Sequence, residues 1–431
     1  MNKKWIVREA NPLLKNILAQ QLHISPLLAQ ILLNRGLLSP EEAAEFMYAD
    51  LSSVPDPFLL KDLDRAVERI LSAVNRKEKI LVYGDYDADG ITSTVLLVHL
   101  LRRLGAPVEY YLPNRLAEGY GVHLEILRKT RAAGTALVIT VDCGIGALTE
   151  AEWARDNGLD LIITDHHQVP EVLPEALAAI NPKRGDCPYP EKELAGVGVA
   201  LKLAQALLKE TPGSDAKAWQ DFLDLACLGT VADIVPLLGE NRLLVKYGLP
   251  LLAGAKRPGI GALLEISGCA GQKMGTREIS FSLAPRLNAG GRMGDARRAV
   301  ELLLCRDPDE AREIALELEK ANQRRQEIEQ KVFEQALLML KEVPPDEREK
   351  IIILAHEEFH PGVTGIVASR LVEQLSRPVL LISLEKDRGK GSGRSIPGFH
   401  LHEALTRCRE HLLSYGGHAQ AAGFTLKTSE L

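Results

Sequence analysis

The sequence predicts an α/β protein in which a parallel-sheet domain is joined by a long helix to a smaller α/β domain. Short apolar runs alternate with helix-length segments, and the first four runs cover residues 80–83, 107–111, 136–141 and 161–164. Runs this apolar indicate parallel strands covered on both faces by helices. A charged stretch from Pro308 to about Glu342, stopped by a Pro-Pro pair, indicates the long helix. The alternation of strands and helices then restarts at residues 350–354 and 378–382.

These patterns divide the chain into four expected segments. Residues 1–75 are predicted to form short helices, one of which starts at Ser39-Pro40-Glu41-Glu42. Residues 76–240 are expected to form the first α/β domain, and residues 241–344 a connecting region with the long helix. Residues 345–431 are expected to form the smaller domain, incomplete at its C-terminus. We expect the active site in the cleft between the two α/β domains.

Composition and charge narrow the class of protein. The 431 residues are 46% hydrophobic and 26% charged, which is typical of a globular enzyme. A net charge of −6 argues mildly against a nucleic-acid binder, but bound divalent cations or a local basic track could still hold a polyanion. The six cysteines are dispersed without a C-x-x-C pair, which fits a reducing cytoplasm, and no long apolar stretch predicts secretion or a membrane span.

The densest cluster of chemically active side chains is the segment Gly84-Asp85-Tyr86-Asp87-Ala88-Asp89-Gly90. It follows the first apolar run and precedes a predicted helix at residues 92–104, so three carboxylates share one strand-to-helix turn. Such crowding of negative charge is costly unless a cation is bound. A calcium loop of the EF-hand type is the alternative, but it needs Glu where residue 96 is Leu, and it lies between two helices. A catalytic metal site is therefore the preferred interpretation.

Ligand-type residues also follow two further predicted strands. Asp142 follows the third run, and Asp165-His166-His167 follows the fourth, while Asp233 ends an apolar helical stretch. Taken alone, Asp142 or Asp233 would more often be a turn or cap residue, and either histidine a structural imidazole. The carboxyl ends of parallel strands share one edge of a sheet, so we expect these residues to converge there.

Carboxylate and imidazole donors without a thiolate favour Mn²⁺ or Mg²⁺ over a structural zinc. Two such ions about 3.5–4 Å apart are suited to hydrolysis of phosphate esters, and Asp142 could bridge them. Adjacent residues of an extended segment point in opposite directions. One of His166 and His167 is therefore expected to bind an ion while the other faces phosphate or orients a ligand.

The four motifs together resemble those of the DHH phosphoesterases. The resemblance implies two Mn²⁺ or Mg²⁺ ions held by a shared set of carboxylates and one imidazole, with Asp85 in a supporting or ligating position. It also implies catalytic or phosphate-facing roles for Asp142, Asp165 and His167. The implied metal ligands are Asp85, Asp87, Asp89, Asp142, His166 and Asp233.

Longer stretches resemble the RecJ exonuclease branch of that family. They are Pro113-Asn114-Arg115 with Glu118-Gly119-Tyr120-Gly121, residues 194–200, and residues 286–293. Residues 360–363, 390–395 and 416–419 resemble the DHHA1 substrate-binding domain, and their glycines would let backbone N–H groups approach an anion. The substrate-binding residues implied in this way are Arg286, Asn288, Arg292, Ser392, Arg394, Gly417 and His418.

The resemblance implies a 5′→3′ exonuclease that hydrolyses single-stranded DNA to 5′-mononucleotides during DNA repair and recombination. The 5′ phosphate would bind Ser392 and Arg394 with Arg286 or Arg292. Single-strand-binding protein and a helicase are the expected partners. A guiding OB-fold usually follows this region in the family, so the chain is either a trimmed core or a short member. The alternatives are a DHH phosphodiesterase acting on short oligoribonucleotides or cyclic dinucleotides, and a replication scaffold without catalysis.

Overall fold

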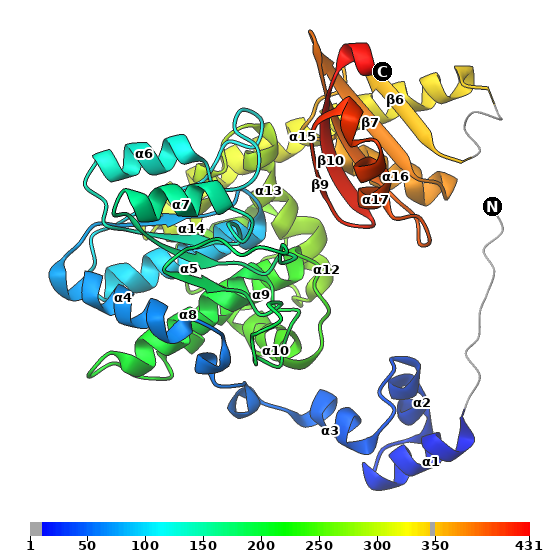
Figure 1. The fold of residues 1–431 in the computed structure, drawn as a ribbon. Coiled ribbons are helices and arrows are strands. Elements are labelled where there is room, and N and C mark those ends of the chain that lie inside the picture. The colour runs from blue at the N-terminus through cyan, green and yellow to red at the C-terminus, as the bar shows by residue number, and fades with distance from the viewer. Residues whose placement is uncertain (1–10, 345–349) are drawn as a thin grey trace. The chain divides into compact units, whose positions relative to one another are not determined.

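The computed structural model describes residues 11–344 and 350–431 (Figure 1). The chain divides into two compact units. The first unit contains the described residues 11–82, 96–109 and 127–254. The second contains residues 83–95, 110–126 and 255–431, apart from the five undescribed residues. The chain therefore passes between the units more than once, and the first carboxylate motif belongs by its packing to the second unit.

Three short helices begin the described chain: α1 (Pro12–Gln21), α2 (Pro26–Asn34) and α3 (Pro40–Tyr48). Each has a proline at its start and a capping side chain before it, which is the arrangement that best satisfies the free N–H groups of a first turn. Ser39 and Glu42 form the capping box that the sequence predicts. These helices share a small core around Leu18, Leu32 and Ala43.

The first sheet has the strand order β2-β1-β3-β4-β5. Its strands are β1 (Ile80–Tyr83), β2 (Val108–Tyr111), β3 (Leu137–Val141), β4 (Asp160–Thr164) and β5 (Ala178–Ile180). β3, β4 and β5 pair in parallel, and every residue of β1 and β3 is buried, which explains their uninterrupted apolar sequences. The parallel sheet and its first four strands are confirmed.

Helices connect and flank these strands: η1 (Leu51–Ser53), η2 (Pro57–Leu59), α4 (Leu63–Arg76), α5 (Ala88–Arg103), α6 (Leu124–Ala132) and α7 (Leu148–Asp156). The helix after the first motif begins at Ala88 and not at Thr92, so the prediction of its start was wrong. The Asp87 carboxylate accepts hydrogen bonds from the backbone N–H groups of Asp89 and Gly90 at 3.0 and 3.1 Å, which caps the helix four residues earlier.

Four helices follow β5 in the first unit: α8 (Gly196–Glu210), η3 (Ala218–Phe222), α9 (Leu223–Ala232) and α10 (Gly239–Ala253). α8 and α10 are joined by a buried ion pair between Lys202 Nζ and Glu240 Oε1 at 3.2 Å. Lys202 also donates to the Pro55 carbonyl at 2.6 Å, and Tyr189 donates to the other Glu240 oxygen. Burial lowers the pKa of Lys202 and raises that of Glu240, while their pairing opposes both shifts.

The second unit contains the helices that precede and include the long helix. They are α11 (Pro258–Ile266), α12 (Thr276–Glu278), the π-helix η4 (Ile279–Leu283), α13 (Ala284–Met293), α14 (Arg297–Leu304) and α15 (Pro308–Glu342). α15 has 35 residues and the predicted bounds. Asp307 caps its first turn with hydrogen bonds to two backbone N–H groups.

The C-terminal α/β domain is built on a mixed sheet of order β6-β7-β8-β10-β9. Its strands are β6 (Ile352–His356), β7 (Val379–Glu385), β8 (Arg388–Arg394), β9 (Leu412–Gly417) and β10 (Ala421–Lys427). β6 and β7 are parallel and the other pairs antiparallel. One apolar cluster joins the sheet to α15 and α16 (Thr364–Leu375), and another joins it to α17 (Leu401–Arg407); η5 (Arg409–His411) and η6 (Thr428–Glu430) complete the domain.

Among the described helices, none combines the length and apolar character needed to cross a membrane. All six cysteines are free thiols, and four of them are buried.

Candidate metal centre

Three neighbouring strands of the first sheet end in candidate ligands. Asp85 lies two residues beyond β1, Asp142 directly follows β3, and Asp165 directly follows β4. β1, β3 and β4 are adjacent in the sheet, so their carboxyl ends share one edge. Asp142 has a left-handed backbone with φ 61°, a conformation that Asp tolerates better than most residues. The sequence prediction that these strand ends converge agrees with this topology.

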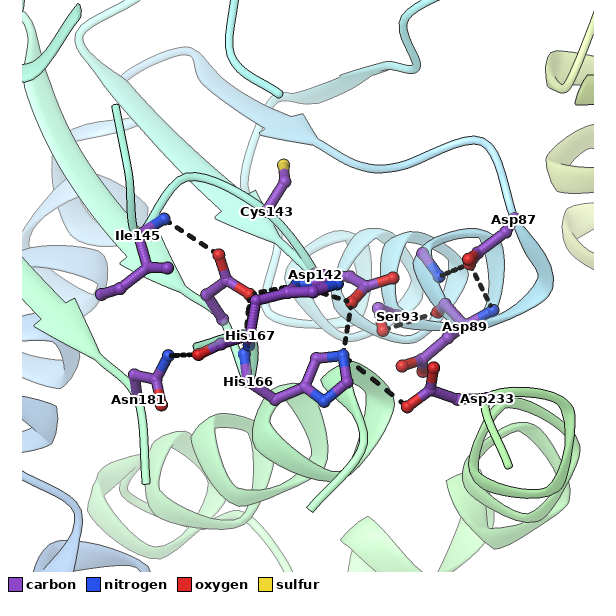
Figure 2. A network of polar contacts seen from close by, with 12 residues as sticks. Asp87, Asp89, Ser93, Asp142, Cys143, Ile145, His166, His167, Asn181 and Asp233 are labelled. Carbon is purple, nitrogen blue, oxygen red and sulfur yellow. Dashed lines mark hydrogen bonds and ion pairs between the residues drawn. The ribbon is translucent and has the colours of Figure 1, made fainter. Parts of the chain in front are cut away.

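His166 lies between two carboxylates in Figure 2. Its Nε2 atom is 3.0 Å from Asp142 Oδ1 and 3.7 Å from Asp233 Oδ2. Burial, followed by the charge of His167, lowers the pKa of His166 to about 3. The ring is therefore neutral near pH 7, and neutral imidazole is the form that binds a metal ion.

Asp165 organises the segment that carries both histidines. One of its oxygens accepts from the backbone N–H groups of His166 and His167 at 2.7 and 3.0 Å and contacts His167 Nδ1 at 2.7 Å. The other accepts from Ile145 N–H at 2.9 Å. Burial alone would raise the pKa of Asp165, but the hydrogen bonds and charge of His167 hold it below its ordinary value. These contacts fit a supporting role for Asp165.

The first motif forms the start of α5. Asp87 caps the helix, and Ser93 donates to the Asp89 carbonyl at 2.7 Å (Figure 2). The Ala88 N–H donates to Asn288 Oδ1 on α13 at 2.7 Å, which ties the motif to the helices of the second unit. Gly90 packs directly on Asp85: a Cβ atom here would lie 2.7 Å from the Asp85 carbonyl oxygen. The motif therefore needs glycine at position 90 for packing as well as carboxylates for ligands.

Within the described parts of the chain, three groups of side chains offer ligand atoms that lie within 4.8 Å of one another. All the donors are carboxylate oxygens or imidazole nitrogens, a set that suits Mn²⁺ or Mg²⁺. The Cys143 thiol is directed away from these donors in Figure 2. The groups are Asp142 with His166 and His167; Asp89 with His166 and Asp233; and Asp85 with Asp87 and Asp142.

Two residues that were not predicted as site residues support the centre. A Cβ atom on Gly196, the first residue of α8, would lie 2.7 Å from Asp142 Oδ1, so glycine lets the helix approach this carboxylate. Asn181 is fully buried and donates through Nδ2 to the His167 carbonyl at 3.0 Å. Asn181 follows β5, a strand that the sequence did not predict, so no local pattern marked this residue.

Several arginines crowd together in the second unit. Burial and the charges of Arg115, Arg325 and Arg394 together lower the pKa of Arg292 to about 9, although the charge of Asp87 opposes them. The Arg115 guanidinium lies 5.2 Å from the Tyr86 ring centre, and Arg394 contacts Ser392 Oγ at 3.4 Å. This concentration of partly buried positive charge favours binding of an anion such as phosphate. Arg115 lies in a quoted motif but was not among the predicted site residues.

The other predicted substrate-binding residues have different surroundings. Arg286 pairs with Glu319 of α15 at 2.5 Å and donates to the Ser282 carbonyl at 2.7 Å, so its guanidinium is already engaged. Asn288 holds the first motif, as described above. Gly417 has φ 135° and, with His418, begins the turn from β9 to β10, where the His418 N–H donates to the Ala421 carbonyl at 2.7 Å. The substrate-binding roles stay predictions.

Comparison with known families agrees with this description. The DHH family, N-terminal domain, matches residues 79–230, and the DHHA1 domain matches residues 348–431. Fold and candidate ligands thus define a protein of the DHH/DHHA1 class. The chain belongs to the RecJ family within that class, as its sequence motifs predicted. It is 41% identical to the single-stranded-DNA-specific exonuclease RecJ of Escherichia coli, over 94% of this chain and 72% of that protein.

Other relatives extend the comparison. The RecJ protein of Bacillus subtilis is 43% identical over 99% of this chain, but the chain spans only 54% of that protein's length. A crystal structure of RecJ in complex with Mn²⁺ from Thermus thermophilus matches with a TM-score of 0.84 and 35% identity, covering 97% of this chain and 59% of that one. A RecJ structure bound to manganese matches with a TM-score of 0.74 and 39% identity, covering 86% and 91%.

Proposed function

We propose that this chain is a two-metal-dependent 5′→3′ exonuclease that hydrolyses single-stranded DNA to 5′-mononucleotides. The observation that carries the proposal is the gathering of carboxylate and imidazole donors into three ligand groups. Membership of the RecJ family supports the choice of single-stranded DNA as the substrate. The reaction class follows from the donor set, because paired divalent ions held by carboxylates are suited to phosphodiester hydrolysis.

The proposed ligands are Asp85, Asp87, Asp89, Asp142, His166 and Asp233. When bound, two Mn²⁺ or Mg²⁺ ions would activate a water molecule and neutralise charge on the phosphate. The protein's part is to hold these ligands in place. Asp165 contacts His167 Nδ1 at 2.7 Å and so orients the imidazole ring, which we assign a phosphate-facing role.

The proposed polarity depends on recognition of the 5′ phosphate by the second unit. Arg292, Arg394 and Ser392 would bind this phosphate, and we add Arg115 because its charge acts on both arginines. The ion pair of Arg286 with Glu319 favours Arg292 over Arg286 for this role. The same proposal keeps the predicted cleft as the active site and the predicted substrate-binding roles of Gly417 and His418. It also keeps the predicted segment boundaries at residues 75, 240 and 344.

A polarity assay tests the function. The protein is incubated with Mn²⁺ and a 30-nucleotide single-stranded DNA that is labelled at one end and carries or lacks a 5′ phosphate. Dinucleotides are tested in parallel. Release of mononucleotides from the 5′ end, faster on the phosphorylated strand, is the expected result. Cleavage of dinucleotides alone would instead support the phosphodiesterase alternative. Binding of the strand without cleavage would support the scaffold alternative.

A pair of substitutions tests the phosphate site. Arg292→Gln is expected to raise KM for the phosphorylated strand by about tenfold or more and to affect the 5′-hydroxyl strand much less. Arg298→Gln is the matched control, because Arg298 is more exposed and pairs with Glu301 and Glu317. Equal effects of Arg292→Gln on both strands would contradict the proposed phosphate site.

The biological setting completes the proposal. An enzyme that needs single-stranded ends would suit a role in DNA repair and recombination. It would be located in the cytoplasm and would act beside single-strand-binding protein and a helicase. The six free cysteines support a reducing compartment. Co-purification of the protein with single-strand-binding protein, tested with and without DNA, would examine the partner prediction.

A further inference from the structure

Ile234 combines three unfavourable properties beside a proposed metal ligand. It follows Asp233, the C-cap of α9, and its backbone is left-handed with φ 64°. Its side chain is apolar and is 84% exposed. Eight described residues other than glycine have a positive φ, and Ile234 is the β-branched member of that set.

The position would ordinarily be occupied by glycine. Helices commonly end with a left-handed residue just after the C-cap, and glycine is favoured there because it has no Cβ atom. A β-branched residue in this conformation is strained. Glycine here would relieve the strain and remove an exposed apolar side chain, so the folded protein alone gives no reason for isoleucine. Strain of this kind is characteristic of functional sites.

The neighbouring ligand indicates what the side chain contacts. Asp233 Oδ2 is 3.7 Å from His166 Nε2, and Asp233 belongs to a candidate metal-ligand group. Consecutive Cα atoms are about 3.8 Å apart, so a side chain one residue beyond a ligand is within a nucleotide's length of the bound phosphate. The apolar surfaces of a nucleotide are its base face and the C–H edge of its sugar.

We propose that Ile234 is a substrate-contacting residue that packs its apolar side chain on the sugar and base of the nucleotide at the scissile phosphate. This inference rests on the proposed function for its substrate class. It explains why the chain keeps a strained, exposed isoleucine where glycine would be more stable. The contact is not specific to one base, because every nucleotide presents an apolar base face and sugar edge.

Three substitutions at position 234 test the contact, with a matched control elsewhere. Ile234→Gly removes strain and side chain, Ile234→Asn tolerates the left-handed backbone but is polar, and Ile234→Val keeps the branched apolar surface. Ser376→Gly is the control, since Ser376 is exposed, has φ 55° and is the left-handed C-cap of α16, one position nearer its helix than Ile234 is to α9. The measurements are kcat and KM on a 5′-phosphorylated 12-nucleotide single-stranded DNA, the Mn²⁺ concentration that gives half-maximal rate, and the Tm of each variant.

The expected result is a separation of stability from substrate binding. Ile234→Gly should raise Tm by about 2–4 °C, and both it and Ile234→Asn should raise KM about three- to tenfold with kcat within about twofold. Ile234→Val should keep KM near wild type, and Ser376→Gly should leave both constants unchanged. An unchanged KM in Ile234→Gly would overturn the proposal. So would a lower kcat with a weaker Mn²⁺ response at constant KM, which would mean that Ile234 acts only through Asp233.

The test also separates this proposal from the proposed function. A wild-type protein that cleaves single strands, together with a silent Ile234→Gly, would overturn the contact alone. If the wild type cleaves only dinucleotides, the exonuclease proposal fails. The same variants are then compared on the dinucleotide, and a raised KM there would still support the contact of Ile234 with the substrate. A wild type that neither binds nor cleaves either substrate would overturn both.

Discussion

Gly196→Ala places one methyl group against a proposed metal ligand without removing any donor atom. The new Cβ would lie 2.7 Å from Asp142 Oδ1 and 2.8 Å from Asp142 Cβ and Cγ. Ordinary contacts begin near 3.4 Å, so the carboxylate or the start of α8 must move by about 0.7 Å. Displacements of this size at a reactive site, and changes to the residues that support metal ligands, typically cost about 10- to 100-fold in activity or metal affinity.

We therefore expect Gly196→Ala to lower the initial rate of single-strand cleavage by about 10- to 100-fold and to raise the Mn²⁺ concentration for half-maximal rate. Stability should change by no more than about 1 kcal/mol, because alanine also favours the helix. Gly261→Ala is the matched control, since Gly261 also lies in a helix, α11. Its new Cβ would meet Ala255 Cβ at 3.8 Å, which is an ordinary contact. A wild-type rate and Mn²⁺ dependence in Gly196→Ala would contradict the proposed contact between this glycine and a metal ligand.

Three further predictions address the metal site and the buried ion pair. Asp142→Ala is expected to lower nuclease activity by about a thousandfold or more while leaving the circular dichroism spectrum unchanged, and retained cleavage would contradict the assigned centre. Removal of divalent ions with EDTA should abolish cleavage, and added Mn²⁺ or Mg²⁺ should restore it; activity that survives chelation would exclude metal dependence. Lys202→Met should cost about 3–5 kcal/mol in urea unfolding because it leaves the buried Glu240 carboxylate without its cation. Combining it with Glu240→Leu should recover most of that loss, and an equal loss in the double variant would contradict the explanation.

Much of the first sheet could be predicted because its strands are buried on both faces. Such strands are continuous apolar runs, and β1 and β3 carry that signal in full. β5 was missed, since its three residues, Ala178–Ile180, are too short and too rich in alanine to show a strand pattern. The separate helices of residues 241–304 were not predicted either, because only a connecting region was expected there.

The candidate ligands could be predicted from their places after strands, but the residues that hold them could not. The start of α5 was placed too late because residues 84–90 were taken as a strand-to-helix turn, whereas Asp87 caps the helix and brings residues 88–91 into it. In the fold the hydroxyls of Thr92, Ser93 and Thr94 donate to carbonyls four residues earlier at 2.8, 2.7 and 2.7 Å, which keeps them compatible with a helix. The contact of Gly196 with Asp142 joins residues 54 positions apart, and no local pattern encodes such a distance.

The spread of the proposed ligands along the chain also bears on how the protein is made. Asp85 and Asp233 are separated by 148 positions, and the set is divided among strand ends and a helix end. A ribosome adding about 5–20 residues per second would take about 7 to 30 s between these two residues. The proposed ligand set is therefore complete only after the whole first sheet and α9 have been synthesised. Under the proposed function, truncated products that stop before residue 233 would lack a ligand and would not cleave DNA.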